Sequence, residues 1–258
     1  MNKHVIIPVL AALFAINFLT SCSNNPESTA KLQEPTTQAG APASTQGEIK
    51  GGEKDEMDGA AEKEGKQDGG VIANTGSTVI SDLSDAFTGE TTASAKYAAY
   101  SKKAQEEGFP QIAMLFKAAS TSENIHANNH RAVLEDMGAT IPVVKPTFSV
   151  KTTQENLQDA IAGESYEIAT MYPGFLANAK TSGNQLASIS LNYAFKTEQK
   201  HKVLYDKALA ALQSNQVKTL SMQYCVCPTC GNTYDQTPPE RCGISMTNSE
   251  KFITIAKA

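Results

Sequence analysis

The feature that most constrains this chain is acid placed inside apolar helical stripes. Four segments between residues 78 and 215 repeat apolar residues every three or four positions, which is the spacing of a helix face buried in a bundle. Each of these faces carries glutamate near its midpoint, and none carries Lys or Arg to pair with it. Because an uncompensated buried carboxylate is strongly destabilising, the fold must supply positive charge from elsewhere.

Glycine and proline divide this region into four predicted helices. A glycine ends each of the first two, and the stretch 139–153, which contains two prolines, is too long for a tight turn, so we expect it to cross along the bundle. Pro173 and Gly174 are expected to kink the third helix or loosen its second half. Gly183 and Asn184 separate it from the fourth helix. The predicted ranges are about 78–107, 110–137, 154–182 and 185–215.

The acids form a pattern typical of a di-metal site. One helix carries a lone glutamate, one carries Glu-x-x-Glu, and the other two carry Glu-x-x-His. Residues three apart share a helix face, so antiparallel packing would bring all of these groups to one level. Mixed carboxylate and imidazole ligands suit two iron or manganese ions, as in di-metal carboxylate bundles, although solvated surface residues are the alternative. The predicted ligands are Glu90, Glu123, His126, Glu164, Glu167, Glu198 and His201.

Three further side chains lie on the same faces. His130 follows Glu123 by seven residues, which is too far along the axis to share a metal ion with it, so we expect it to support the ligands or fill the core. Tyr97 is predicted to be a core tyrosine whose hydroxyl reaches the ligand cluster. Met171 is predicted to be a core residue.

The C-terminal stretch gathers four of the five cysteines. Cys227-x-x-Cys230-Gly is half of a four-thiolate metal site, but the second half reads Cys242-x-x-Ser245 instead of Cys-x-x-Cys. The sequence therefore predicts a knuckle for one iron or zinc ion, with Cys225 as a spare thiol that could replace the serine. The alternative is a knuckle that holds no metal or forms a disulfide, since an exported protein meets oxidising conditions.

The N-terminal part is predicted to be a targeting segment and a tether. An apolar run leads into Leu-Thr-Ser-Cys22, which resembles a bacterial lipobox, so residues 1–21 are predicted to be a signal peptide and Cys22 the lipidated residue; an ordinary signal peptide is the alternative. Residues 22–76 are polar and predicted to be disordered. We expect an exported bacterial lipoprotein, anchored to a membrane and facing the periplasm or cell exterior. The net charge of −5, without a basic stripe, argues against nucleic-acid binding.

In their order along the chain, these motifs resemble the rubrerythrin family. The resemblance covers about residue 77 to the end, and it implies a mainly α fold. A ferritin-like four-helix bundle would span 77–215, with a long crossover between its second and third helices, and a small β rubredoxin-like metal knuckle would span 216–258. The stretches that carry the resemblance are 86–90 with Tyr97, 123–127, 160–167 with 171–173, Glu198-x-x-His201, 239–242 and 250–252.

The same resemblance implies a non-haem di-iron peroxidase that reduces hydrogen peroxide to water in oxidative-stress defence. Carried onto this chain, it implies that two glutamates bridge the irons while one acid and one imidazole exchange on a single iron. The implied roles are Glu123 and Glu198 as bridges, Glu90, Glu164 and His201 as terminal ligands, Glu167 and His126 as the exchanging pair, and Tyr97 as a further catalytic candidate.

Electrons would reach the di-iron site through the rubredoxin-like domain, in the family usually across the interface of a homodimer, from a donor that the sequence does not identify. Ser245 departs from the family, which has a fourth cysteine at this position. The alternative functions are an oxygen-using ferroxidase and an iron-binding protein with a degenerate rubredoxin site.

Overall fold

The computed structural model describes residues 69–257, with side chains from Thr75 onward. The predicted signal peptide, most of the predicted tether and Cys22 lie outside the described residues. Within the described range, no helix combines the length and the apolar character that a bilayer span requires.

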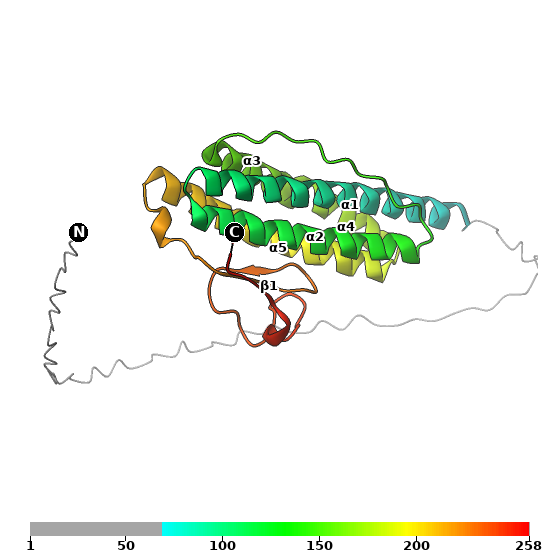
Figure 1. Cartoon of the computed structure of the whole chain (residues 1–258). Helices are drawn as coiled ribbons and strands as arrows, with labels where there is room; N and C mark the ends of the chain where they lie inside the picture. Colours follow the sequence, from blue (N-terminus) through cyan, green and yellow to red (C-terminus); the bar gives the residue numbers. More distant parts are fainter. Residues whose placement is uncertain (1–68, 258) are drawn as a thin grey trace, which may run out of the picture. The chain divides into compact units, whose positions relative to one another are not determined.

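The described chain is mainly helical, and five α-helices form the bundle (Figure 1). Helices α1 and α2 make the first hairpin, and a long crossover leads to α3, which continues into α4 and returns as α5. The predicted bundle with a long crossover between its second and third helices is therefore confirmed. The helices are α1 (Gly69–Glu106), α2 (Pro110–Asp136), α3 (Thr153–Tyr166), α4 (Tyr172–Thr181) and α5 (Gln185–Gln213).

The first helix is longer than expected. It begins at Gly69 rather than near Thr78, so residues 69–76, which we predicted to be the end of the tether, are helical. Once a helix is nucleated, each further residue adds one hydrogen bond at little cost, and this stretch contains no proline to stop it. Composition alone therefore gave the wrong boundary.

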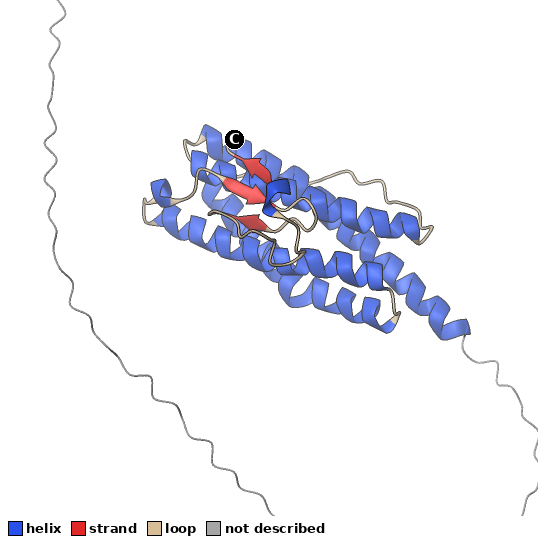
Figure 2. Ribbon diagram, turned by 90° about the horizontal axis from the view of Figure 1, so that it is seen from below, coloured by secondary structure: helices blue, strands red, loops and turns tan. Residues whose placement is uncertain are grey.

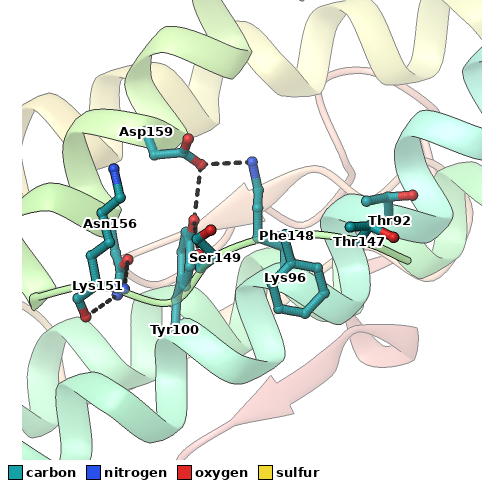
Figure 3. A pocket seen from close by; sticks show the side chains of 9 residues that line it. All are labelled: Thr92, Lys96, Tyr100, Thr147, Phe148, Ser149, Lys151, Asn156 and Asp159. Carbon is teal, nitrogen blue, oxygen red and sulfur yellow. Dashed lines mark hydrogen bonds and ion pairs between the residues drawn. The ribbon is translucent and has the colours of Figure 1, made fainter. Parts of the chain in front are cut away.

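Hydrogen bonds hold the C-terminal end of the crossover, which runs from residue 137 to residue 152, against the helices. Thr152 caps α3 in a capping box with Glu155. The Tyr100 hydroxyl of α1 lies 3.2 Å from the carbonyl of Ser149 in the crossover and 3.0 Å from Asp159 Oδ2 of α3. Figure 3 shows the surface pocket at this junction, where the side chains of Tyr100 and Lys96 both reach Asp159.

The third predicted helix changes its winding just before Pro173 and Gly174, where we expected a kink or a looser second half. A π-helical segment, η1 (Glu167–Met171), joins α3 to α4, and the Tyr172 N–H bonds to the Glu167 carbonyl. Proline has no N–H to offer the preceding turn, and the wider π turn accommodates this without breaking the helix. Such π segments are frequent at functional sites.

The core consists of two apolar clusters separated by the level of the acidic residues. On α1, Leu83 belongs to one cluster and Tyr97 to the other, with Glu90 between them in the sequence. On α5, Leu191 and Tyr205 flank Glu198 in the same way. The buried acids are thus enclosed between two apolar layers.

The C-terminal segment is a small sheet that packs on the outside of α2 and α5 (Figures 1 and 2). Its three antiparallel strands have the order β2-β1-β3, and Cys225 of β1 pairs with Tyr234 and Thr254. This agrees with the predicted rubredoxin-like knuckle. The elements are η2 (Val217–Thr219), β1 (Tyr224–Val226), β2 (Thr233–Tyr234), η3 (Ser249–Lys251) and β3 (Ile253–Ile255).

Candidate di-metal centre

Six of the seven predicted ligands converge in the middle of the bundle, and all six are buried. Their ligand atoms form two groups, each within 4.8 Å, and both groups share Glu123 and Glu198. A shared pair of carboxylates between two sets of terminal ligands is the arrangement expected for two metal ions. The first group is Glu90, Glu123, His126 and Glu198, and the second is Glu123, Glu164, Glu198 and His201.

The two shared carboxylates face both histidines. His126 Nδ1 lies 2.9 Å from Glu123 Oε2 and 2.9 Å from Glu198 Oε1. His201 Nδ1 lies 3.1 Å from the other oxygen of Glu123 and 2.8 Å from the other oxygen of Glu198. Each shared carboxylate therefore presents one oxygen to each histidine, which is the geometry of a bridge.

The hydrogen bonds of the site separate bridging from terminal carboxylates. Tyr172 donates to Glu90 Oε1, and Tyr97 donates to Glu164 Oε1 over 3.1 Å, so each of these glutamates keeps only Oε2 without a partner. In Glu123, by contrast, neither oxygen has a hydrogen-bond partner, and the same is true of Glu198.

The two ring nitrogens of each ligand histidine also differ in their surroundings. In both ligand histidines Nε2 is engaged outside the site, while Nδ1 faces only the carboxylates of the ligand set and makes no hydrogen bond of good geometry with them. Among the described residues, eight of the ten buried side-chain atoms without a partner belong to these six ligands. Buried polar atoms almost always have a hydrogen-bond partner. Two cations would supply the partners that these eight atoms lack, with four of the atoms as ligands to each cation.

The charges of the cluster lead to the same conclusion. Burial, followed by the charges of Glu123 and Glu198, raises the pKa of Glu90 to about 8. Burial alone would lower the pKa of His201, but the charges of Glu123 and Glu198 outweigh it and raise this pKa to about 10. A bound cation must displace these protons, so metal binding strengthens as the pH rises through these values.

Glu167, the seventh predicted ligand, lies in neither group. It is half-buried at the start of the π segment. Burial and then the charges of Glu90 and Glu198 raise its pKa, so its carboxyl is near the first group without joining it. The structure therefore has His126, and not Glu167, in the ligand position that the two were predicted to exchange.

The knuckle contacts the ligands of the bundle within the same chain, which we did not predict from the sequence. The Cys230 carbonyl lies 3.0 Å from His126 Nε2 and accepts a hydrogen bond from Thr197. His201 Nε2 lies 3.1 Å from Thr233 Oγ1 of β2. Gly231 is required here, because its φ is +77° and a Cβ would come within 2.4 Å of His126 Nε2.

Two similar turns build the cysteine site. In the first turn, the Gly231 N–H bonds to the Cys227 carbonyl; in the second, the Met246 N–H bonds to the Cys242 carbonyl. Gly231 and Met246 both have positive φ, at +77° and +60°. Ser245 therefore occupies in the second turn the place that Cys230 has in the first.

Ser245, and not Cys225, lies beside the other three cysteines. Cys227, Cys230 and Cys242 form a buried group with sulfur atoms within 4.8 Å of one another, and Cys225 is not part of it. Ser245 Oγ lies 3.3 Å from Cys227 Sγ. The four described cysteines are all free thiols, so the disulfide alternative is not observed.

Comparisons with known proteins agree with this geometry. The Rubrerythrin family model matches residues 82–209. Rubrerythrin-2 of Clostridium acetobutylicum is 34% identical over 171 residues, which cover 66% of this chain and 92% of that protein. Nigerythrin of Nitratidesulfovibrio vulgaris is 33% identical over 180 residues, covering 69% of this chain and 86% of that one. The structure of fully reduced, all-ferrous nigerythrin superposes with a TM-score of 0.62 at 31% identity, over 68% of this chain and 86% of that chain.

The bridge assignment predicts how metal content responds to substitution. Glu123→Ala or Glu198→Ala should lose both bundle irons, because each removes one donor from both positions, whereas Glu90→Ala removes a donor from only one position. The measurement is the iron content per folded chain, from which the iron bound by the cysteine knuckle is subtracted. Full metal content in both bridge variants would contradict the assignment.

The knuckle gives a second prediction. An oxygen ligand at Ser245 should weaken and blue-shift the sulfur-to-iron absorption relative to a four-thiolate site, and Ser245→Cys should restore an ordinary red rubredoxin spectrum. Cys225→Ser is the matched control and should change little. The assignment is wrong if the native protein already has the ordinary spectrum and Cys225→Ser abolishes it.

Proposed function

This chain belongs to the rubrerythrin family and carries a di-iron site, and we propose that it is a peroxidase that reduces hydrogen peroxide to water. Its four buried glutamates and two histidines would hold the irons, and the cysteine knuckle would hold a further metal ion. The physiological role that follows is defence against oxidative stress.

The observation that carries the proposal is the position of Glu167. It lies at a π-helical turn and outside both ligand groups, where its carboxyl interacts with the charges of Glu90 and Glu198, while His126 is in the ligand position. An anionic oxygen suits ferric iron better than a neutral imidazole does, so a carboxylate held nearby favours a site that changes oxidation state. A site that only stores iron gains nothing from such a group.

The chain supplies the surroundings that the reaction needs. When bound there, two ferrous ions would supply the two electrons that, with two protons, convert one hydrogen peroxide molecule into two water molecules. The apolar clusters above and below the ligands exclude bulk water, which strengthens every electrostatic interaction inside. Tyr172 and Tyr97 hold protons at the oxygens of Glu90 and Glu164 next to the metal positions.

We further propose that electrons enter through the knuckle of the same chain. The backbone of Cys230 contacts His126, and Ser122 donates to the Gly231 carbonyl over 2.7 Å, so a ligand of one metal site touches a ligand of the other without a second chain. The external electron donor is a separate protein or small reductant. A homodimer, which the family resemblance implies, is compatible with this contact.

Glu167→Ala tests the role of this carboxylate. The variant should retain both bundle irons, because Glu167 is not in either ligand group, but should lower peroxide turnover roughly tenfold or more. Stopped-flow oxidation of the reduced protein by hydrogen peroxide, compared with oxidation by oxygen, measures the effect and separates a peroxidase from a ferroxidase. Unchanged peroxide turnover, or faster oxidation by oxygen in the native protein, would reject the proposal.

We also propose that the protein is a membrane-anchored lipoprotein. The support is the lipobox-like sequence before Cys22 and the polar stretch that follows it, both outside the described residues. The catalytic domains would then face the periplasm or the cell exterior.

Cys22→Ser should release the protein from membranes, because it removes the one lipid-bearing thiol that the motif provides. Fractionation of cells that express the full chain measures this, with Cys225→Ser as the matched control. Membrane retention of a processed Cys22→Ser protein would contradict the anchor.

A further inference from the structure

His130 is a fully buried histidine that binds no metal in the arrangement above. It lies on α2, one turn beyond His126, and belongs to neither ligand group. Burial, together with the nearby charge of His126, lowers its pKa to about 3, so its imidazole is neutral at pH 7. Its two nitrogens contact Ser190 of α5 and Tyr172 of α4.

The direction of these hydrogen bonds follows from counting protons. The Tyr172 hydroxyl has one proton, which it donates to Glu90 Oε1. Toward His130 Nε2, 3.4 Å away, this hydroxyl can therefore only accept, so Nε2 must carry the proton of the neutral imidazole. Nδ1 is then an acceptor, and the Ser190 hydroxyl, 2.8 Å away, must donate to it.

The result is a buried row of donors that all point toward one metal ligand, from Ser190 through His130 and Tyr172 to Glu90. The corresponding phenol on the other side, Tyr97, donates to Glu164 without such a histidine behind it. The two terminal carboxylates are therefore supported differently. The supported one, Glu90, belongs to the group that contains His126 and lies near Glu167.

We propose that Ser190 and His130 are positioning residues that hold the Tyr172 phenol as a donor to Glu90 Oε1 and thereby keep Glu90 a one-oxygen ligand. With Oε1 occupied by the phenol, only Oε2 faces the metal position. With its second oxygen held by the phenol, Glu90 would leave room for an incoming oxygen ligand, whether peroxide or Glu167. The inference rests on the di-metal site and does not depend on which oxidant the protein uses.

The native protein provides the first test. In protein loaded with Zn²⁺, which is diamagnetic, the ¹⁵N shifts of the His130 imidazole should identify the form with the proton on Nε2. A proton on Nδ1 would reverse the row of donors and overturn the proposal. This measurement involves neither turnover nor a variant that could fail to fold.

Substitutions test whether His130 acts through Tyr172. His130→Leu and Tyr172→Phe should each weaken one of the two Co²⁺ binding steps by about tenfold, because Tyr172→Phe removes the donor to Glu90 Oε1 and His130→Leu removes the group that positions this donor. The double variant should be no weaker than either single variant. His130→Gln, whose amide can donate to Tyr172 and accept from Ser190, should bind Co²⁺ as the native protein does.

Tyr97→Phe is the contrasting variant, because Tyr97 donates to Glu164 and not to Glu90. Its effect on Co²⁺ affinity should therefore be independent of the effect of His130→Leu, so that the two fold-changes multiply in the double variant. The proposal is overturned if the effects of His130→Leu and Tyr172→Phe multiply, or if His130→Leu leaves both Co²⁺ steps unchanged. If the native protein shows the expected tautomer and the variants show the expected Co²⁺ binding, but the native protein does not turn over peroxide, the proposed function fails and this role stands.

Discussion

Burying four carboxylates at one level of a helical bundle is the constraint on which the rest of this structure depends. Among the described residues, no Lys or Arg forms an ion pair with them, and the two histidines at that level cannot both balance the charge and leave every oxygen satisfied. Two cations resolve both problems. The apolar clusters on either side then become an advantage, because they keep water from competing for the ligand positions.

Six of the seven predicted ligands could be placed together from the sequence because helical spacing is rigid; the exception is Glu167, which lies in neither group although it is three residues from Glu164. Glu123 and His126 are three residues apart on an apolar face, and no alternative packing of that helix separates them. The roles of individual oxygens could not be read in this way. They depend on Tyr172 and Tyr97, which lie far from Glu90 and Glu164 in sequence and meet them only after the helices have packed.

Two other features were beyond sequence reasoning for physical reasons. A π turn begins at Glu167 because the bundle holds the helix on both sides of Pro173. Sequence rules for proline consider only its immediate neighbours and therefore predict a kink or a looser helix. The knuckle docks through backbone carbonyls at Cys230 and Gly231, and a carbonyl leaves no signal in the sequence. The one available hint was the glycine itself, which can be explained by the turn alone.

The central claim is that two iron ions bind to eight side-chain atoms of the four buried glutamates and two histidines, the atoms that otherwise lack a hydrogen-bond partner. Anomalous diffraction at the iron edge from crystals of the iron-loaded protein tests it most directly. The account predicts two iron peaks in the bundle, bridged by Glu123 and Glu198, with Nδ1 of His126 bound to one and Nδ1 of His201 bound to the other. A single peak at this level, or histidines bound through Nε2, would contradict it.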